Sequence, residues 1–377
     1  MRREPVILKG NCLDTLKTLP DCSIDSIVTD PPYEYGFMGK SWDNSGIAYN
    51  VEMWRECLRV LKPGGHLLAF SGSRTYHRMT VAIEDAGFEI RDQIAWISNK
   101  TFPKSLNVSK AIDKAAGLLE HEASAFTVAG RTDKNLPSPV TKGYEPPKPQ
   151  SPEAQRWQGW GTALKPAHEP ICVARKPLTG TVASNVLEWG TGALNIDGSR
   201  VGDEKLNLLP AGSMSGTSMR GPDPKGSESH TVIGRWPANV IHDGSEEVLA
   251  GFPNDAGRFF YCAKASKSER NAGLEGMVER RPDERTETGM GTFAEKGVAK
   301  QSNFHPTVKP LALMRYLVKL VTPPNGTVLD PFLGSGSTAV ACVLEGFDWI
   351  GCEMTEDYWP IIEARVEWAE AQPRTLL

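Results

Sequence analysis

One stretch near the end of the sequence reads TVLDPFLGSGST (Thr327–Thr338). It begins as a short apolar strand that ends at Asp330, and Gly334 and Gly336 then form a turn that leads into a helix. Glycine at such a turn lets the backbone come close to a ligand. An acid, Glu353, ends the next predicted strand, where it can accept hydrogen bonds from ribose hydroxyls. The stretch therefore predicts a site for a nucleoside cofactor, a pattern that NAD, FAD and S-adenosylmethionine sites share.

The sequence on both sides of the irregular middle alternates between short apolar strands and amphipathic helices. At the N-terminal end, predicted strands at residues 6–8, 24–29 and 66–70 are separated by helical segments with apolar residues three or four positions apart. After Pro310, a helix, the strand at residues 327–330, a second helix and another strand follow one another. Such alternation is typical of an α/β fold, in which helices cover an open sheet.

A second motif, Asp30-Pro31-Pro32-Tyr33, directly follows the apolar strand at residues 24–29. We expect it at the carboxyl edge of the sheet, where ligands bind in open α/β folds. Proline fixes φ, offers no backbone N–H and restricts the residue before it to extended conformations. The motif is therefore a stiff array of hydrogen-bond acceptors, namely the Asp30 carboxylate and the Pro31 carbonyl, beside an aromatic ring.

Such an array suits the exocyclic amine of adenine or cytosine, which is a poor nucleophile because its lone pair is delocalised into the ring. Two acceptors that hold both N–H groups favour a more pyramidal nitrogen and stabilise the positive charge that develops on it during alkylation. The Tyr33 ring can stack on a base that has turned out of a duplex. With a sulfonium methyl donor at the glycine turn, the two motifs together predict methyl transfer to a base amine.

The order of these motifs, D-P-P-Y before F-x-G-x-G with a long segment between them, resembles the beta-class amino-DNA methyltransferases, particularly their phage and prophage site-specific members. Further similar stretches lie at residues 8–13, 61–65, 167–176 and 305–310. The resemblance implies a Rossmann-like S-adenosylmethionine-dependent methyltransferase fold with permuted motif order. It further implies a mixed seven-stranded sheet with helices on both faces, plus an irregular target-recognition insertion.

The implied activity is site-specific transfer of a methyl group from S-adenosylmethionine to N6 of adenine in double-stranded DNA. The target base would be flipped and methylated directly, with S-adenosylhomocysteine as product and no metal. The target base and its amine would be held by Asp30, Pro31, Pro32 and Tyr33. The cofactor would be bound by Asn11, Cys12, Asp30, Thr307, Lys309, Asp330, Pro331, Phe332, Gly334, Ser335, Gly336, Ser337, Thr338, Glu353 and Met354.

Within that implied set, Glu353 would hold the ribose, and Thr307 and Lys309 would lie near the methionine end of the cofactor. Lys309 suits that place because the cofactor carboxylate needs a cationic or N–H partner. DNA contacts are expected at Lys40, Trp42, Arg74, Lys100 and Lys104. The family usually has an acid where this chain has Asn11 and often a glutamine where it has Val308, so the family's cofactor contacts are not carried over in detail at these two positions.

The predicted organisation is a catalytic core in two parts, residues 1–176 and 305–377, around a target-recognition insertion at residues 177–304. Within the insertion, residues 212–229 and 280–301 are predicted to be mobile loops, because they lack the apolar residues that would offset the entropy of ordering.

The formal net charge of −4 means that DNA has to be met by a local basic surface. A candidate lies between Lys100 and Gly180, which hold twelve Lys and Arg against seven Asp and Glu. The seven cysteines lie far apart without a C-x-x-C pair, so neither a zinc site nor a disulfide framework is predicted. No run of about 18 apolar residues occurs, which predicts no membrane span and a cytoplasmic location. The partners considered besides DNA are a second copy of the chain and a cognate nuclease, as in restriction–modification systems.

Three alternatives stay open at this point. Cytosine-N4 methylation uses the same chemistry, and adenine is favoured because D-P-P-Y rather than S-P-P-Y is more often associated with adenine in the resembled family. A nicotinamide-dependent oxidoreductase would use the glycine turn but would leave the D-P-P-Y motif and the basic segment unexplained. A catalytically silent DNA-binding protein would have no need to keep Asp30 and Tyr33.

Overall fold

The structure is a computed structural model, and its described residues are 6–35, 44–98, 105–118, 148–208, 230–263, 267–277, 279 and 302–372. The chain divides into two compact units. One comprises Met1–Ser98 together with His168–Leu377, and the other is Asn99–Ala167.

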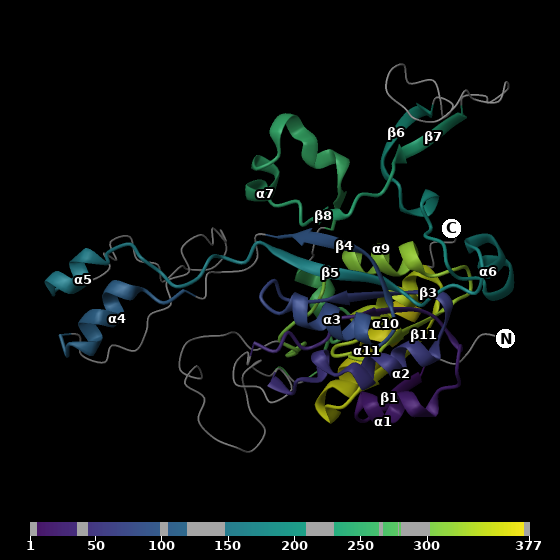
Figure 1. Ribbon diagram of the computed structural model, residues 1–377, viewed down its shortest axis with the longest axis horizontal. Helices are drawn as coiled ribbons and strands as arrows, with labels where there is room; N and C mark the ends of the chain where they lie inside the picture. The colour runs from purple at the N-terminus through teal and green to yellow at the C-terminus, as the bar shows by residue number, and fades with distance from the viewer. Residues whose placement is uncertain are drawn as a thin grey trace. The chain divides into compact units, whose positions relative to one another are not determined.

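The larger unit is built on one mixed sheet of nine strands in the order β1-β11-β10-β2-β3-β5-β4-β8-β9. Figure 1 shows the neighbouring strands β3, β5 and β4 of this sheet. The strands β1, β11, β10, β2 and β3 pair in parallel, whereas β5 is antiparallel to both β3 and β4. Their bounds are Val6–Lys9 (β1), Ile24–Thr29 (β2), Leu61–Phe70 (β3), Glu89–Ile97 (β4), His168–Arg175 (β5), Val240–His242 (β8), Tyr261–Cys262 (β9), Thr327–Asp330 (β10) and Asp348–Glu353 (β11).

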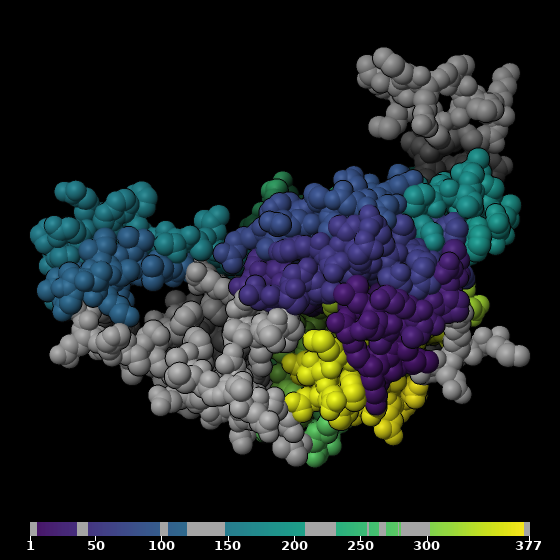
Figure 2. All heavy atoms as spheres, turned by 60° about the horizontal axis from the view of Figure 1, so that its bottom comes forward, coloured from purple at the N-terminus to yellow at the C-terminus, as the bar shows by residue number. Residues whose placement is uncertain are grey.

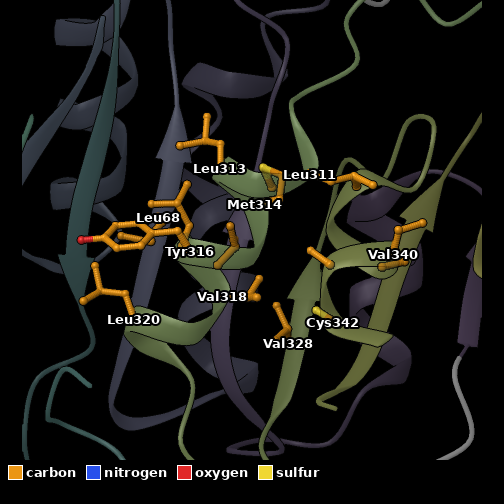
Figure 3. Close-up of a cluster of buried hydrophobic side chains, with 14 of the residues drawn as sticks. Leu68, Leu311, Leu313, Met314, Tyr316, Val318, Leu320, Val328, Val340 and Cys342 are labelled. Carbon is orange, nitrogen blue, oxygen red and sulfur yellow. The ribbon is translucent and has the colours of Figure 1, made fainter. Parts of the chain in front are cut away.

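Helices cover both faces of this sheet because successive residues of a strand point to opposite faces, and the central strands carry apolar residues on both. In β2, Val28 belongs to one buried cluster and Ile27 to another. The first cluster packs against α9 (Leu311–Val321), α10 (Ser337–Glu345) and α11 (Trp359–Glu370), and the second against α1 (Cys12–Thr15), α2 (Val51–Val60) and α3 (Tyr76–Asp85). Figure 3 shows the first cluster, where side chains of α9 and α10 meet Val328 of β10 and Leu68 of β3.

The two ends of the chain contribute neighbouring strands to the sheet. Strand β1 lies at the sheet edge and pairs with β11, with Val6 opposite Ile350 and Lys9 opposite Glu353. Figure 2 shows the N-terminal elements and the C-terminal elements side by side on the surface of this unit. The irregular middle of the sequence therefore separates two parts of one folded core.

The predicted number of seven strands is wrong, because the described residues form a nine-stranded sheet. The additional strands β8 and β9 come from the segment that the sequence predicted as an insertion. β8 pairs in parallel with β4, and β9 pairs with β8. The same segment contains α6 (Val182–Trp189), α7 (Glu246–Ala250), α8 (Lys267–Asn271) and a separate antiparallel pair, β6 (Val201–Leu208) with β7 (His230–Arg235).

The predicted mobile loops at residues 212–229 and 280–301 lie outside the described residues. The domain boundaries at residues 177 and 304 stay a prediction. The smaller compact unit, Asn99–Ala167, falls within the part that was predicted as the N-terminal half of the core.

The smaller unit contains α4 (Val108–Ala115) and α5 (Pro152–Arg156). The buried Asp113 carboxylate joins the two helices, since it accepts a 2.6 Å hydrogen bond from the Ser151 hydroxyl and others from the N–H groups of Gln150 and Ser151. These hydrogen bonds, led by the one from the Ser151 side chain, hold the pKa of Asp113 below its ordinary value. Within the described ranges of the whole chain, no helix is long and apolar enough to cross a membrane.

Replacing Leu317 by alanine tests the core around α9. Leu317 is fully buried between α9 and the sheet, so Leu317→Ala leaves a cavity and is expected to lower the free energy of unfolding by about 2–5 kcal/mol. Urea unfolding measures this loss. Leu187→Ala on α6 is the matched control, because that side chain is 88% exposed and its removal should cost less than about 0.5 kcal/mol. Equal effects of the two substitutions would contradict the described packing.

Candidate active site

Parallel strand pairing brings the two sequence motifs to one edge of the sheet. β10 lies between β2 and β11, with Leu329 opposite Ile27 on one side and Ile350 on the other. Because these strands run in the same direction, their carboxyl ends lie together. Asp30 after β2 and Asp330 at the end of β10 therefore stand at the same edge, although 300 positions separate them in the sequence.

The Asp330 carboxylate joins this edge to the helix behind it. Its Oδ1 accepts hydrogen bonds from Thr29 Oγ1 at 2.6 Å and Phe332 N at 3.0 Å, and its Oδ2 accepts one from Thr338 Oγ1 at 2.6 Å. The side chain is buried, and burial raises its pKa to about 6. Through these hydrogen bonds, Asp330 connects β2, β10 and α10. It thereby holds the strand that precedes the D-P-P-Y motif close to the glycine turn.

The glycine turn has the backbone conformation that its sequence predicts. Gly334 and Gly336 have φ of +55° and +79°, where a side chain is strained. A Cβ at Gly334 would also stand 2.9 Å from His305 Nε2. Burial lowers the pKa of His305 to about 3, so this ring is neutral and packs against the turn without adding charge. His305 Nδ1 lies 3.1 Å from the carbonyl oxygen of Thr307, which keeps Thr307 beside the turn.

Arg365 of α11 supports the same turn from inside the protein. It is almost completely buried, and its Nη1 donates to the carbonyl oxygen of Ser335, to Ser335 Oγ at 3.0 Å and to Ser337 Oγ at 3.3 Å. Burial lowers its pKa to about 10, which still leaves it charged at neutral pH. The sequence alone does not predict this contact, because one arginine on a helix carries no signal that distinguishes it from a solvent-exposed one.

Glu353 ends β11 next to the glycine turn, as the sequence predicted. Its Oε2 accepts a 2.8 Å hydrogen bond from Gly334 N, and its Oε1 accepts one of 2.6 Å from Thr355 N. Burial raises the pKa of this carboxyl above its ordinary value. The carbonyl oxygen of Glu353 also accepts from Gly10 N, so the loop before α1 begins beside this site. The adjacent Met354 is exposed.

Asn11 and Cys12, both predicted near the cofactor, begin α1. Asn11 caps this helix, with its Oδ1 accepting from Leu13 N at 2.9 Å. Cys12 is buried, and burial raises its pKa to about 11, so its thiol is protonated at neutral pH. A protonated, buried thiol is a poor nucleophile.

The D-P-P-Y motif forms a charged cluster with two residues from distant parts of the chain. Lys309 Nζ lies 2.8 Å from Asp30 Oδ2 and 3.2 Å from Glu169 Oε2, and it donates to the Tyr33 hydroxyl at 3.1 Å. Tyr33 in turn donates its hydroxyl hydrogen to Glu169 Oε2 at 2.6 Å. The second oxygen of Asp30, Oδ1, is buried and has no hydrogen-bond partner. We call these four residues, Asp30, Tyr33, Glu169 and Lys309, the carboxylate–lysine cluster.

Burial and charge act in opposite directions on this cluster. Burial raises the pKa of Asp30, and the Lys309 ammonium opposes that rise. Burial lowers the pKa of Lys309, but the carboxylates of Asp30 and Glu169 outweigh it and bring that pKa above its ordinary value. Burial, followed by the same two carboxylates, raises the pKa of Tyr33 well above its ordinary value. Lys309 is therefore charged, and Tyr33 keeps its hydrogen for donation.

Two residues of this cluster, Lys309 and Glu169, make contacts that were not predicted from the sequence. Lys309 was assigned to the methionine end of the cofactor, and the structure directs its ammonium to Asp30, Glu169 and Tyr33. Glu169 was not assigned a role at all, although the stretch that contains it resembled the family. Its position before Pro170 in β5 gives no local indication that it meets Tyr33, 136 positions earlier in the chain.

Of the residues predicted to contact DNA, only Arg74 lies within the described residues. Its side chain is exposed, with the guanidinium 4.5 Å from the centre of the Tyr35 ring. Tyr35 meets Tyr33 edge to face, which places Arg74 near the D-P-P-Y motif. Lys40, Trp42, Lys100 and Lys104 lie outside the described residues. Among the residues with described positions, no group of His, Cys, Asp or Glu has the arrangement of a metal site.

Comparison with known proteins identifies the family. The model of the DNA methylase family, which comprises N6 and N4 methyltransferases, matches residues 24–364. The chain belongs to the DNA methylase family. The predicted Rossmann-like methyltransferase fold agrees with this membership and with the mostly parallel sheet covered by helices on both faces. This methylase uses S-adenosylmethionine as its cofactor, as predicted from the sequence.

Individual relatives of this methylase are distant. It is 23% identical to the type II methyltransferase M.HindIII of Haemophilus influenzae over 338 residues, which are 89% of this chain and 70% of that protein. It is 33% identical to M.HinfI, also of Haemophilus influenzae, over 116 residues, 26% of this chain and about a third (32%) of that relative. Among solved structures, the cytosine-N4-specific PvuII DNA methyltransferase matches with a TM-score of 0.47 and 14% identity, covering 100% of this chain and 89% of that one.

The pH dependence of stability tests the buried state of Asp330. Its pKa is about 6 in the folded protein against 3.8 when unperturbed, so its contribution to stability is present below about pH 4 and is lost as the pH rises through about 6. This shift corresponds to about 3 kcal/mol. Asp330→Asn does not titrate, so the unfolding free energy of the variant relative to wild type should rise by about that amount between pH 4 and pH 7.5.

Urea unfolding of both proteins at several pH values measures this difference. Asp85→Asn serves as the control, because Asp85 is exposed at the end of α3. A difference between wild type and Asp330→Asn that stays constant with pH would show that Asp330 does not titrate in this range.

Proposed function

We propose that this methylase transfers a methyl group from S-adenosylmethionine to the N6 amine of adenine in double-stranded DNA, after flipping the target base. The observation that supports this most directly is the place of Asp30. Its buried Oδ1 has no protein partner, and it stands at the edge of the sheet where β10 leads into the glycine turn. An unpartnered buried carboxylate oxygen is costly unless a ligand donates a hydrogen bond to it.

The residues at the glycine turn fit the cofactor. We propose that Glu353 holds the ribose, because each of its oxygens accepts one backbone hydrogen bond and retains a lone pair for a ribose hydroxyl. Arg365 supports this turn from inside the protein, where it donates hydrogen bonds to the Ser335 and Ser337 hydroxyls. When bound, S-adenosylmethionine supplies an electrophilic methyl group on its sulfonium and becomes S-adenosylhomocysteine once that methyl has been transferred.

The D-P-P-Y motif would hold the target amine. Asp30 Oδ1 accepts one N–H of the amine and the Pro31 carbonyl accepts the other, which leaves the nitrogen lone pair free to form the new bond to carbon. The nitrogen becomes positively charged as that bond forms, and the adjacent carboxylate stabilises this charge. The methylated nitrogen then gives one proton to Asp30 Oδ1, whose pKa is raised by burial and is suited to accept it. Tyr33 stacks on the flipped base.

Cytosine N4 is the second candidate, since its amine presents the same two N–H groups to the same acceptors. Adenine is preferred because of the D-P-P-Y sequence of the motif. The type II relatives support a restriction–modification setting, in which a separate nuclease would cut the unmethylated recognition sequence. We further propose that residues 177–304 read that sequence, that Arg74 contacts the DNA backbone, and that the enzyme acts in the cytoplasm of a bacterial or phage-infected cell.

Replacing Asp30 tests the assignment of the catalytic carboxylate. Asp30→Ala is expected to lower the rate of methyl transfer at least about 10³-fold, because both the acceptor and the adjacent negative charge are lost. Binding of S-adenosylmethionine, measured by calorimetry on the same protein, should change less than about threefold. Asp85→Ala is the control, since this exposed aspartate lies outside the site. Unchanged turnover in Asp30→Ala would contradict the assignment.

Product analysis decides which base is modified. Mixed-sequence duplex DNA is incubated with the protein and S-adenosylmethionine, hydrolysed to nucleosides and examined by mass spectrometry. We expect N6-methyladenine. N4-methylcytosine would establish the second candidate, and the absence of any methylated nucleoside, with cofactor binding demonstrated, would contradict the proposed activity.

A further inference from the structure

The carboxylate–lysine cluster contains one more acid than the proposed chemistry has used. An ammonium group has three N–H donors, and Lys309 directs them to three oxygens, those of Asp30, Glu169 and Tyr33. Asp30 and Tyr33 belong to the D-P-P-Y motif, but Glu169 comes from β5, on the other side of β3. The Lys309 ammonium is thereby fixed in position, with every donor satisfied by this chain.

Glu169 is held rigidly. It lies in β5 opposite Trp96 of β4, and the carbonyl oxygen of the next residue, Pro170, accepts a 3.0 Å hydrogen bond from Ser71 N at the end of β3. Its carboxylate therefore approaches Lys309 and Tyr33 from a paired strand in the middle of the sheet. A group placed on such an element keeps its geometry better than one on a loop.

Glu169 decides the net charge of the cluster. Lys309 and Asp30 alone would form a neutral pair at 2.8 Å. The Glu169 carboxylate, 3.2 Å from the same ammonium, adds a second acid, so the cluster carries one net negative charge when both acids are ionised. The side chains of Lys309, Asp30 and Glu169 are only 9%, 18% and 23% exposed, so water screens this charge weakly.

Glu169 also fixes the orientation of Tyr33. The phenol has a single hydrogen, which it donates to Glu169 Oε2 at 2.6 Å, while its oxygen accepts from Lys309. Glu169 Oε2 also lies 3.2 Å from Lys309 Nζ, so one carboxylate oxygen contacts both the phenol and the ammonium that donates to it. Loss of this oxygen would release the ring that the D-P-P-Y motif presents to a base.

We propose that Glu169 is a positioning residue for methyl transfer, which gives the carboxylate–lysine cluster its net negative charge and thereby stabilises the cationic nitrogen formed beside Asp30. The inference rests on the proposed function. The target amine is neutral before the reaction and positively charged as it gains the methyl group, so a negative cluster favours the transition state over the bound substrate. A neutral cluster would bind the same substrates but would not provide this difference.

Glu169→Gln tests the proposal, because the amide keeps the shape and an acceptor for Tyr33 but removes the charge. We expect kcat to fall about 10²-fold, with the KM values for DNA and S-adenosylmethionine changed less than about threefold. Glu169→Asp, which restores the charge, should recover at least about a tenth of the lost rate. Glu89→Gln is the matched control, since Glu89 is a half-exposed acid of the same sheet that pairs with Arg175 of β5.

The pH profile of kcat separates this role from a merely structural one. Burial raises the pKa of Asp30, Lys309 and Tyr33 lower it, and the Glu169 carboxylate raises it further. Asp330, at the neighbouring strand end, is present in wild type and in all three variants. In Glu169→Gln the acid limb of the profile should therefore move to lower pH, even though the maximal rate is smaller. Loss of local structure alone would lower the rate without moving this limb.

The outcomes distinguish this proposal from the proposed function. Should wild type fail to methylate either base, the proposed function fails. If wild type methylates DNA and Glu169→Gln matches it in kcat and in its acid limb, only the role of Glu169 is overturned. A Glu169→Gln protein that is folded by its unfolding transition but has lost cofactor binding would also overturn it, because the role would then lie in cofactor binding. If Glu169→Gln does not fold, Glu169→Asp becomes the test. Its kcat must then exceed about 10% of the wild-type value for the proposal to stand.

Discussion

Parallel pairing of β10 with β2 on one side and β11 on the other is the constraint on which the rest of this structure depends. It gives three chain segments a common direction, so that their carboxyl ends form one edge. The buried Asp330 carboxylate then fixes their spacing, by accepting hydrogen bonds from Thr29 of β2 and Thr338 of α10. A motif from the first tenth of the chain and another from its last fifth thereby become parts of one site.

The buried charged groups at this edge of the sheet depend on their partners, which offset the cost of removing each charge from water. Burying an ammonium or a carboxylate alone is costly, and the cost is offset only where partners satisfy the charge. Lys309 meets this requirement with two carboxylates and a phenol, and Asp330 meets it with two hydroxyls and a backbone N–H. Asp30 is the exception, since one of its oxygens is satisfied and the other has no partner in the protein. That asymmetry supports the proposed site of the base amine.

The sequence predicted the features whose signals are local. Strands with continuous apolar residues, the glycine turn at Gly334 and the rigid prolines after Asp30 are each set by residues within a few positions, and the structure has them where they were predicted. The added strands β8 and β9 were missed because strands of three and two residues leave no periodic pattern. Glu169 and Arg365 were missed because their roles arise from contacts across 136 and 30 positions of sequence. The roles assigned to the cofactor residues stay predictions.

The register of β4 and β5 has a consequence for how this chain accommodates its smaller unit. Ile97 and His168 are direct partners at the ends of these antiparallel strands, so the sheet itself holds together the two points where Asn99–Ala167 leaves and returns. The entropy cost of closing a chain segment between two fixed points grows only slowly with the length of the segment. A short hairpin turn would join the same two residues equally well. The position is therefore a natural point for modular exchange, at which accessory segments of different size can be gained or lost while the catalytic scaffold is retained.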